Sequence, residues 1–501
     1  MSVRLAPMPR RCHLFAWRAA SLLAVGTGLL LGTAAVPATA ADGLRLARSA
    51  HGYKAGKALL SQAARYTGKP AVTAADDRHP RGPRRQKGKP PRWRSGPIVS
   101  YPDGPGRGGA VGRVSRRSER PPATAAAQSQ AVPRQVLIVL EQNQSGDLAN
   151  EFARRHGLER KQTQLMSLLN GRCELYELRA NRSLAHVMAA LRGDPRVRLV
   201  QANFRYRTQG ASGTPPTALP QYALDKIALA QAHELARGRD VVVAVIDSAI
   251  DQTHPDLQGA ITLSFDAVGT PDRRGGFHGT AVAGIIRAQG VVAGAAPQAS
   301  ILAVRAFRVG AAGAVAETAS WTLLRAIQWA VENKANVLNL SFVGPRDEAL
   351  HLALQSATSR RVIAVAAAGN NGPKAAPAYP AAYPEVIAVT AVDEKDHRYA
   401  QANRGNYIGF AAPGVDILAP VEKGKHSYLS GTSFATAYVS GIVALLLERN
   451  RDLDTGAVID LIAAGAEDLG PQGRDEDFGA GRVNAFASLK AMERMKDGTN
   501  R

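Results

Sequence analysis

The sequence predicts an α/β fold, in which helices cover both faces of a parallel sheet, preceded by a small α+β domain of the ferredoxin-like kind. The first observation is that, from residue 222 onward, short and almost wholly apolar runs alternate with helical segments. Strands of a parallel sheet are buried on both faces, so they read as continuous apolar runs. The second is the order of strands and helices within residues 134–210, which fits a ferredoxin-like domain.

Within the small domain, apolar residues recur at strand and helix spacings. We expect strands at Val136–Leu140, Cys173–Leu178 and Val197–Tyr206, and helices at Leu148–Gly157 and Ser183–Leu191. There is room for one more strand near Gln164–Leu169. No sharp motif marks this region, so an unrelated small α+β domain is the alternative.

The larger part of the chain continues the alternation of strands and helices to its end. We expect strands at Val241–Ile246, Ile301–Arg305, Val337–Leu340, Val362–Ala366 and Val386–Thr390, and helices at Trp321–Asn333 and Glu348–Ser359. The expected domains are therefore a small one over residues 134–210 and a large one over 211–495.

Residues 1–40 have the features of a secretory signal peptide. Basic residues precede the apolar stretch Ala19–Val36, and a small-residue cleavage site follows near Ala40. An uncleaved membrane anchor is the alternative, because the stretch is almost long enough to span a bilayer. We therefore expect a secreted or periplasmic protein that meets the membrane only during export.

The basic charge of the chain is concentrated outside the large domain. The chain carries a formal net charge of +22, to which residues 43–133 contribute +15, residues 134–210 contribute +6 and residues 211–501 contribute −2. The basic segment 41–133 is rich in Pro, Gly and Arg and cannot build a core, so we expect it to be disordered. We expect no specific nucleic-acid partner, although this segment could contact an anionic surface.

Three polar residues stand at positions where an α/β sheet places its sites. Asp247 ends an apolar strand, His278 opens a helix of small residues, and Ser433 stands where another helix begins. Alone, each has a structural explanation, such as a helix cap for Ser433. Together they supply a nucleophile, a base and an acid that orients the base.

Four motifs carry a resemblance to the subtilisin-like serine peptidase family. Asp247–Ala249, His278–Thr280 and Gly431–Ser433 match its three catalytic signatures, and Ala366–Asn370 matches a fourth. The order Asp, His, Ser is that of subtilisin. The resemblance covers about residues 220–490 and implies a subtilisin-like sheet and a serine endopeptidase that needs no cofactor. It also implies that Asn370 donates a hydrogen bond in the oxyanion hole.

The resemblance also implies which residues bind the substrate. The segment around Ser341, Phe342 and Val343 is similar to the family's substrate-binding strand, and Ala378 falls at the floor of its specificity pocket. Val343 and Ala378 replace residues that are usually Gly. The pocket is therefore expected to be shallow and to accept small or medium apolar residues before the scissile bond.

The small domain resembles, in pattern and position, the inhibitory propeptide of subtilisin-like enzymes. We therefore expect a zymogen in which Phe204–Gly210 lies in the cleft and in which the chain cuts itself between about Arg207 and Thr217. The expected partners are protein or peptide substrates and the chain's own propeptide. The acidic triplet Asp475–Asp477 could hold calcium, although a solvated loop explains it as well. The competing function is a degenerate, inactive subtilase-fold binding protein.

Overall fold

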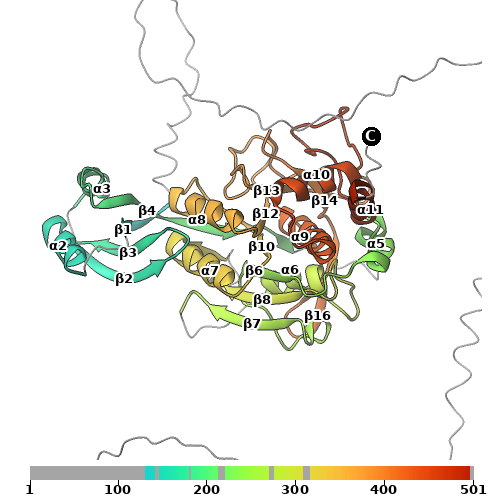
Figure 1. Ribbon diagram of the computed structural model, residues 1–501, viewed down its shortest axis with the longest axis horizontal. Helices are drawn as coiled ribbons and strands as arrows, with labels where there is room; N and C mark the ends of the chain where they lie inside the picture. Colours follow the sequence, from blue (N-terminus) through green and yellow to red (C-terminus); the bar gives the residue numbers. More distant parts are fainter. Residues whose placement is uncertain are drawn as a thin grey trace, which may run out of the picture. The chain divides into compact units, whose positions relative to one another are not determined.

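The computed structural model describes residues 130–141, 146–179, 182–212, 221–269, 276–308 and 316–496 (Figure 1). The predicted signal peptide and nearly all of the predicted basic segment lie outside these residues. In the described part, no helix is both long and apolar enough to cross a membrane.

The small domain is an antiparallel sheet with two helices. Its elements are β1 (Ala131–Glu141), α2 (Gly146–His156), β2 (Leu158–Met166), β3 (Gly171–Leu178), α3 (Leu184–Arg192) and β4 (Val197–Thr208). The strand order is β4-β1-β3-β2, and each neighbouring pair is antiparallel. This is the predicted ferredoxin-like arrangement.

One strand of the small domain lies earlier than the sequence indicates. β2 spans Leu158–Met166, whereas the prediction was a strand near Gln164–Leu169, of which residues 167–169 lie in a turn. β2 is an edge strand with mostly exposed polar side chains. Its composition therefore lacks the apolar alternation that reveals a half-buried strand.

The two faces of β1 belong to two different cores. Val136, Ile138 and Leu140 pack with residues of α2 and α3 inside the small domain. Leu137 and Val139, which point the other way, pack with residues of the large domain's helices. Because side chains alternate along a strand, the small sheet is covered on one face by its own helices and on the other by the large domain.

The large domain is built on a seven-stranded sheet of order β14-β13-β12-β10-β6-β8-β7, in which every pairing is parallel. Its strands are β6 (Val242–Asp247), β7 (Ile261–Asp266), β8 (Ser300–Arg305), β10 (Val337–Leu340), β12 (Ile363–Ala367), β13 (Val386–Val392) and β14 (Phe410–Pro413). The five predicted strands form its centre. β7 and β14, at its edges, were not predicted.

Helices cover both faces of this sheet, as predicted (Figure 1). The helices that matter here are α6 (Phe277–Arg287), α7 (Ser320–Glu332), α8 (Glu348–Ser359) and α9 (Thr432–Arg449). Val243 and Val245 of β6 share a core with α6 and α9, while Ala244 and Ile246 share the other core with α7 and α8.

The remaining helices and strands complete the large domain. They are α4 (Tyr222–Lys226), α5 (Leu229–Leu235), η1 (Pro255–Leu257), β9 (Glu317–Ala319), β11 (Phe342–Val343), β15 (Ile417–Val421), β16 (Lys425–Ser430), α10 (Thr455–Gly465) and α11 (Ala485–Lys496). The short strand β5 (Ala211–Ser212) pairs with β16. β9 and β11 pair with β4 of the small domain and so join the two domains.

Candidate active site

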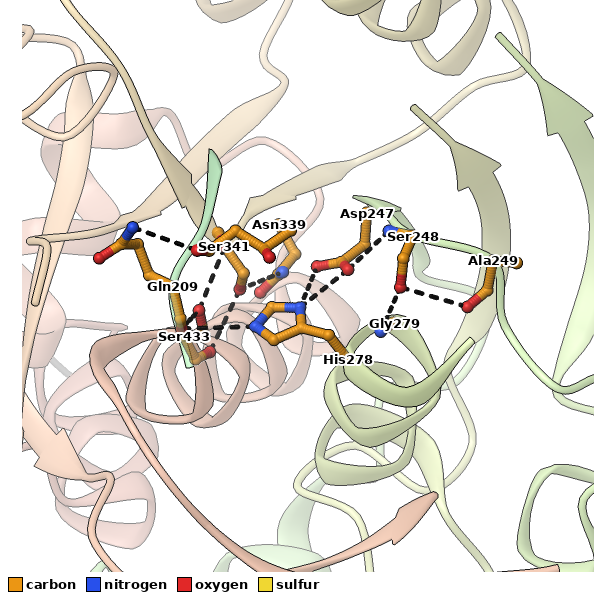
Figure 2. Close-up of polar contacts among 10 residues, drawn as sticks. Gln209, Asp247, Ser248, Ala249, His278, Gly279, Asn339, Ser341 and Ser433 are labelled. Carbon is orange, nitrogen blue, oxygen red and sulfur yellow. Dashed lines mark hydrogen bonds and ion pairs between the residues drawn. The ribbon is translucent and has the colours of Figure 1, made fainter. Parts of the chain in front are cut away.

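The structure brings Asp247, His278 and Ser433 together from three elements (Figure 2). Asp247 is the last residue of the central strand β6, while His278 and Ser433 are each the second residue of a helix, α6 and α9. The carboxyl ends of parallel strands and the N-termini of the helices that follow them meet at one edge of such a sheet. All three side chains are buried.

Asp247 orients His278. The imidazole Nδ1 lies 2.8 Å from Asp247 Oδ1 and 2.9 Å from Oδ2. Because a carboxylate only accepts hydrogen bonds, Nδ1 carries the proton and donates, which leaves Nε2 as the basic nitrogen. Burial opposes protonation of His278, but the charge and hydrogen bond of Asp247 outweigh it and raise the pKa of His278.

The main chain that follows β4, at Gln209, contacts Ser433. The Ser433 hydroxyl donates to the carbonyl oxygen of Gln209 and lies 3.1 Å from that of Ser341. His278 Nε2 lies 3.4 Å from the same Gln209 oxygen. A Cβ added to Gly210 would lie 3.1 Å from His278 Nε2. The base therefore stands beside the peptide bond between Gln209 and Gly210.

Asn370 is held in place through its amide oxygen. Its Oδ1 accepts from the backbone N–H and the hydroxyl of Thr432, at 3.1 and 2.9 Å. With Oδ1 so occupied, the two N–H donors of Nδ2 remain available. A Cβ added to Gly431, whose φ is +156°, would lie 3.0 Å from Asn370 Nδ2 and 3.2 Å from the Gln209 oxygen. Asn370 Nδ2 and the Gln209 carbonyl oxygen thus both border the space beside Gly431, and a side chain at position 431 would fill that space.

Gln209 directly follows β4, and the end of β4 is the middle strand of three, between β9 and β11. Thr208 and Arg207 pair antiparallel with Phe342 and Val343 of β11, and β9 pairs with β4 on its other side. The Gln209 N–H lies 3.2 Å from the Ser341 carbonyl oxygen. Strand addition of this kind holds an extended peptide through its main chain and leaves its side chains to pockets.

The residues predicted to bind substrate take different places along this strand. The Phe342 ring packs edge-on against the ring of Tyr206, with centroids 5.9 Å apart. Ala378 is buried one residue before Tyr379, which bridges to Gly344. The residue before the candidate scissile bond is the polar Gln209, whose Oε1 accepts from Asn370 N at 2.9 Å. The expected preference for apolar residues there stays a prediction.

Polar residues around Ser433 hold the site in place, and for two of them, Asn339 and Ser440, the sequence analysis assigned no role. Asn339 Nδ2 donates to Ser341 Oγ at 2.9 Å, and Ser440 donates to Asn339 Oδ1 at 2.9 Å. The Ser341 hydroxyl in turn donates to the Ser433 carbonyl at 3.2 Å. Ser248 Oγ accepts from the Gly279 N–H at 3.0 Å, which satisfies a donor in the first turn of α6. A polar residue inside an apolar strand, such as Asn339, is the signal that could have revealed them.

The acidic triplet Asp475–Asp477 forms hydrogen bonds and an ion pair within the protein. Asp475 Oδ1 accepts from the backbone N–H groups of Asp477 and Phe478, at 2.7 and 2.8 Å. Asp477 forms an ion pair with Arg398 at 2.9 Å. Among the described residues, no cluster of His, Cys, Asp and Glu could hold a metal ion.

Curated proteins that are similar to this chain include a thermitase, a subtilisin and an intracellular serine protease. It is 34% identical over 281 residues to thermitase of Thermoactinomyces vulgaris, a match that covers 54% of this chain and 96% of thermitase. It is 36% identical to subtilisin E of Bacillus subtilis, over 50% of this chain and 66% of that protein. It is also 36% identical to an intracellular serine protease of Paenibacillus polymyxa, over 42% of this chain and 67% of that protein.

The fold agrees with these relatives. The structure resembles that of fervidolysin from Fervidobacterium pennivorans, described as a keratinolytic enzyme related to subtilisin, with a TM-score of 0.62 and 24% identity. The likeness covers 72% of this chain and 61% of fervidolysin. The model of the subtilase family matches residues 238–481. The chain therefore belongs to the subtilase family of serine endopeptidases.

Proposed function

We propose that this protein is a secreted serine endopeptidase, made as a zymogen whose small domain blocks the active site until the chain cuts itself. The observation that carries the proposal is the position of the Gln209 carbonyl, against the Ser433 hydroxyl and within 3.4 Å of His278 Nε2. A peptide carbonyl in contact with both a nucleophile and its base is in the geometry that acyl transfer needs.

The proposed reaction uses only groups of the protein. Ser433 Oγ attacks the carbonyl carbon while His278 Nε2 takes the hydroxyl proton. The oxyanion forms beside Asn370 Nδ2 and the backbone N–H of Ser433, which lies in the first turn of α9. His278 then passes its proton to the leaving amine, an acyl-enzyme remains, and water hydrolyses it. Asp247 stabilises the imidazolium throughout.

Self-cleavage is proposed to occur between Gln209 and Gly210. This bond lies within the range expected from the sequence, between Arg207 and Thr217. A side chain on Gly210 would crowd Phe434 and His278, at 2.9 and 3.0 Å from its Cβ, so the residue after the bond must be small in this geometry. The pairing of β4 with both β9 and β11 supports an inhibitory role, because the small domain fills the cleft that a substrate strand would enter.

Secretion rests on the N-terminal residues alone. The predicted signal peptide, residues 1–40, lies outside the described part of the chain. The relatives do not decide the location, since one of them is named as an intracellular protease.

A single experiment tests both the enzyme and the zymogen. The full chain should be expressed with its export signal, and the secreted product treated with a fluorophosphonate probe and sequenced from its N-terminus. We expect a labelled species that begins at Gly210, with labelling lost in Ser433→Ala. An unlabelled, uncut chain would instead support the inactive binding protein.

A further inference from the structure

We propose that Asp347 is a specificity-determining residue, which selects tyrosine over phenylalanine as the fourth residue before the scissile bond. The inference rests on the proposed function and names its preferred substrates. With Gln209 directly before the bond, the fourth residue back along β4 is Tyr206, and Tyr206 occupies a closed site in the large domain.

The ring of Tyr206 is enclosed by fixed groups. Its side chain is 0% exposed. Phe342 packs edge-on against the ring, and a Cβ added to Gly344 would lie 2.2 Å from Tyr206 Cδ1. Gly344 is therefore required for the ring to enter. These contacts accept Tyr and Phe equally, because both have the same ring.

The hydroxyl of Tyr206 meets a buried carboxylate. Tyr206 Oη donates to Asp347 Oδ2 at 2.9 Å, and Asp347 is 0% exposed. Burial, followed by the charge of Asp347, holds the pKa of the Tyr206 phenol well above its usual value, so the hydroxyl keeps its proton and donates. Hydrogen bonds to charged groups contribute more to stability and binding than hydrogen bonds between neutral groups.

The donors to Asp347 divide evenly between the two domains. The large domain supplies the Leu350 N–H to Oδ1, at 2.9 Å, and the Ser320 hydroxyl to Oδ2. The small domain supplies Gln201 Nε2 to Oδ1, at 2.7 Å, and the Tyr206 hydroxyl to Oδ2. When the small domain leaves after cleavage, each oxygen loses one donor.

A substrate can restore only one of these lost donors. A peptide in the cleft follows the path of residues 206–209, so its fourth residue reaches Asp347, whereas Gln201 lies further back along β4. Tyr returns a donor to Oδ2. Phe fills the same space and excludes water, so Asp347 Oδ2 keeps the Ser320 donor but does not regain the second one. Sites built to hydrogen-bond a hydroxyl reject the analogue that lacks it for this reason.

The test compares two peptides that copy the chain's own sequence. The enzyme produced by self-cleavage of the full chain is assayed with acetyl-Tyr-Arg-Thr-Gln-aminomethylcoumarin and with its Phe-Arg-Thr-Gln counterpart. We expect kcat/KM for the Tyr peptide to exceed that for the Phe peptide by about 10- to 100-fold, as for the loss of one charge-assisted hydrogen bond.

Two variants separate the carboxylate from other effects. In Asp347→Ser the hydroxyl can still cap α8 through the Leu350 N–H, since Ser and Asp are comparable caps, but no second oxygen reaches the substrate. The Tyr to Phe ratio should fall to within about threefold of one. Glu348→Gln removes an exposed charge from the next position and should keep the wild-type ratio.

The outcomes are distinct. Equal cleavage of both peptides by the wild-type enzyme, or an unchanged ratio in Asp347→Ser, would overturn the inference and leave the proposed protease standing. The wild-type comparison decides the matter even if Asp347→Ser fails to fold. If no peptide is cut and the fluorophosphonate probe does not label Ser433, the proposed function fails, and the inference fails with it.

Discussion

The small and large domains both enclose a sheet with helices, but only the large domain covers both faces of its sheet by itself. Val243 and Ala244 of β6 lie in two cores that are both formed largely by the large domain's own helices. Val136 and Leu137 of β1 also lie in two cores, but the second is formed by α7 and α8 of the other domain. The large domain therefore covers the face of the small sheet that the small domain's own helices leave open.

The shared core affects how the small domain of the proposed zymogen would behave on its own. An isolated small domain would expose the apolar face that carries Leu137, Val139 and Leu175, at a cost of roughly 25 cal/mol for each Å² of apolar surface returned to water. Docking should therefore stabilise the fold of the small domain. In the proposed zymogen, a cut after Gln209 would leave this interface intact, so release of the small domain would need a second step, such as its digestion.

The largest expected effect comes from Ser433→Ala, which removes the nucleophile proposed to cut the chain between the two domains. The precursor should stay uncut and casein hydrolysis should fall by more than about 10⁴-fold, in line with loss of the serine in subtilisin. The domain should still fold, because the hydroxyl serves only the reaction and two carbonyl contacts. Casein hydrolysis by the purified variant at the wild-type rate would refute the assignment of Ser433.

The next effect concerns Asn370→Ala, in which the strand β4 is still held but the oxyanion loses a donor. We expect kcat to fall by about 10²–10³ with little change in KM, because the donor serves charge that is present only in the transition state. Steady-state kinetics on a peptide substrate measure both constants. A rise in KM with kcat unchanged would contradict the oxyanion role.

Substitutions at Leu137 and Ile138 of β1 test the two cores separately, because the two side chains point to opposite faces of the small sheet. Leu137→Ala should weaken inhibition of the processed enzyme by an added 131–209 fragment by about 30-fold or more, since a buried Leu→Ala costs about 2–5 kcal/mol. Ile138→Ala is the matched control, because this residue packs against the fragment's own helices. It should lower the fragment's helix content, measured by circular dichroism, more than Leu137→Ala does.

The fragment itself also tests the role of the small domain. Micromolar 131–209 fragment should suppress peptide hydrolysis by the processed enzyme. Full activity at that concentration would refute the propeptide assignment without affecting that of Ser433.

The smallest effect is a pH dependence of self-cleavage. Protonated His278 cannot accept the proton of Ser433, so the rate rises with pH as the imidazole loses its proton. Asp247 raises the pKa of His278, so the midpoint should lie above the ordinary value of about 6.5. The initial rate of precursor cleavage, measured from pH 5 to 9, gives this midpoint. A midpoint well below pH 6 would show that another group limits the reaction.

The sequence alone was sufficient to predict the architecture and to propose which residues react. The apolar runs that became β6, β10 and β12 are read directly, because burial on both faces leaves no polar residue in them apart from Asn339 and the terminal Asp247. Strand β2 was predicted too late in the chain because an exposed edge strand can be almost entirely polar. The motifs around Asp247, His278 and Ser433 were recognisable because each combines a reactive side chain with the small residues that it needs beside it.

Only the tertiary structure decided which peptide bond faces Ser433 and what Tyr206 contacts. Gln209 and Ser433 are 224 positions apart in the chain, and Tyr206 and Asp347 are 141 apart. No local pattern relates such residues, because the register of β4 between β9 and β11 is set by main-chain hydrogen bonds that every residue can make. A shift of one residue would turn Tyr206 away from Asp347. Packing of the two domains selects the register, and with it the peptide bond that lies against Ser433.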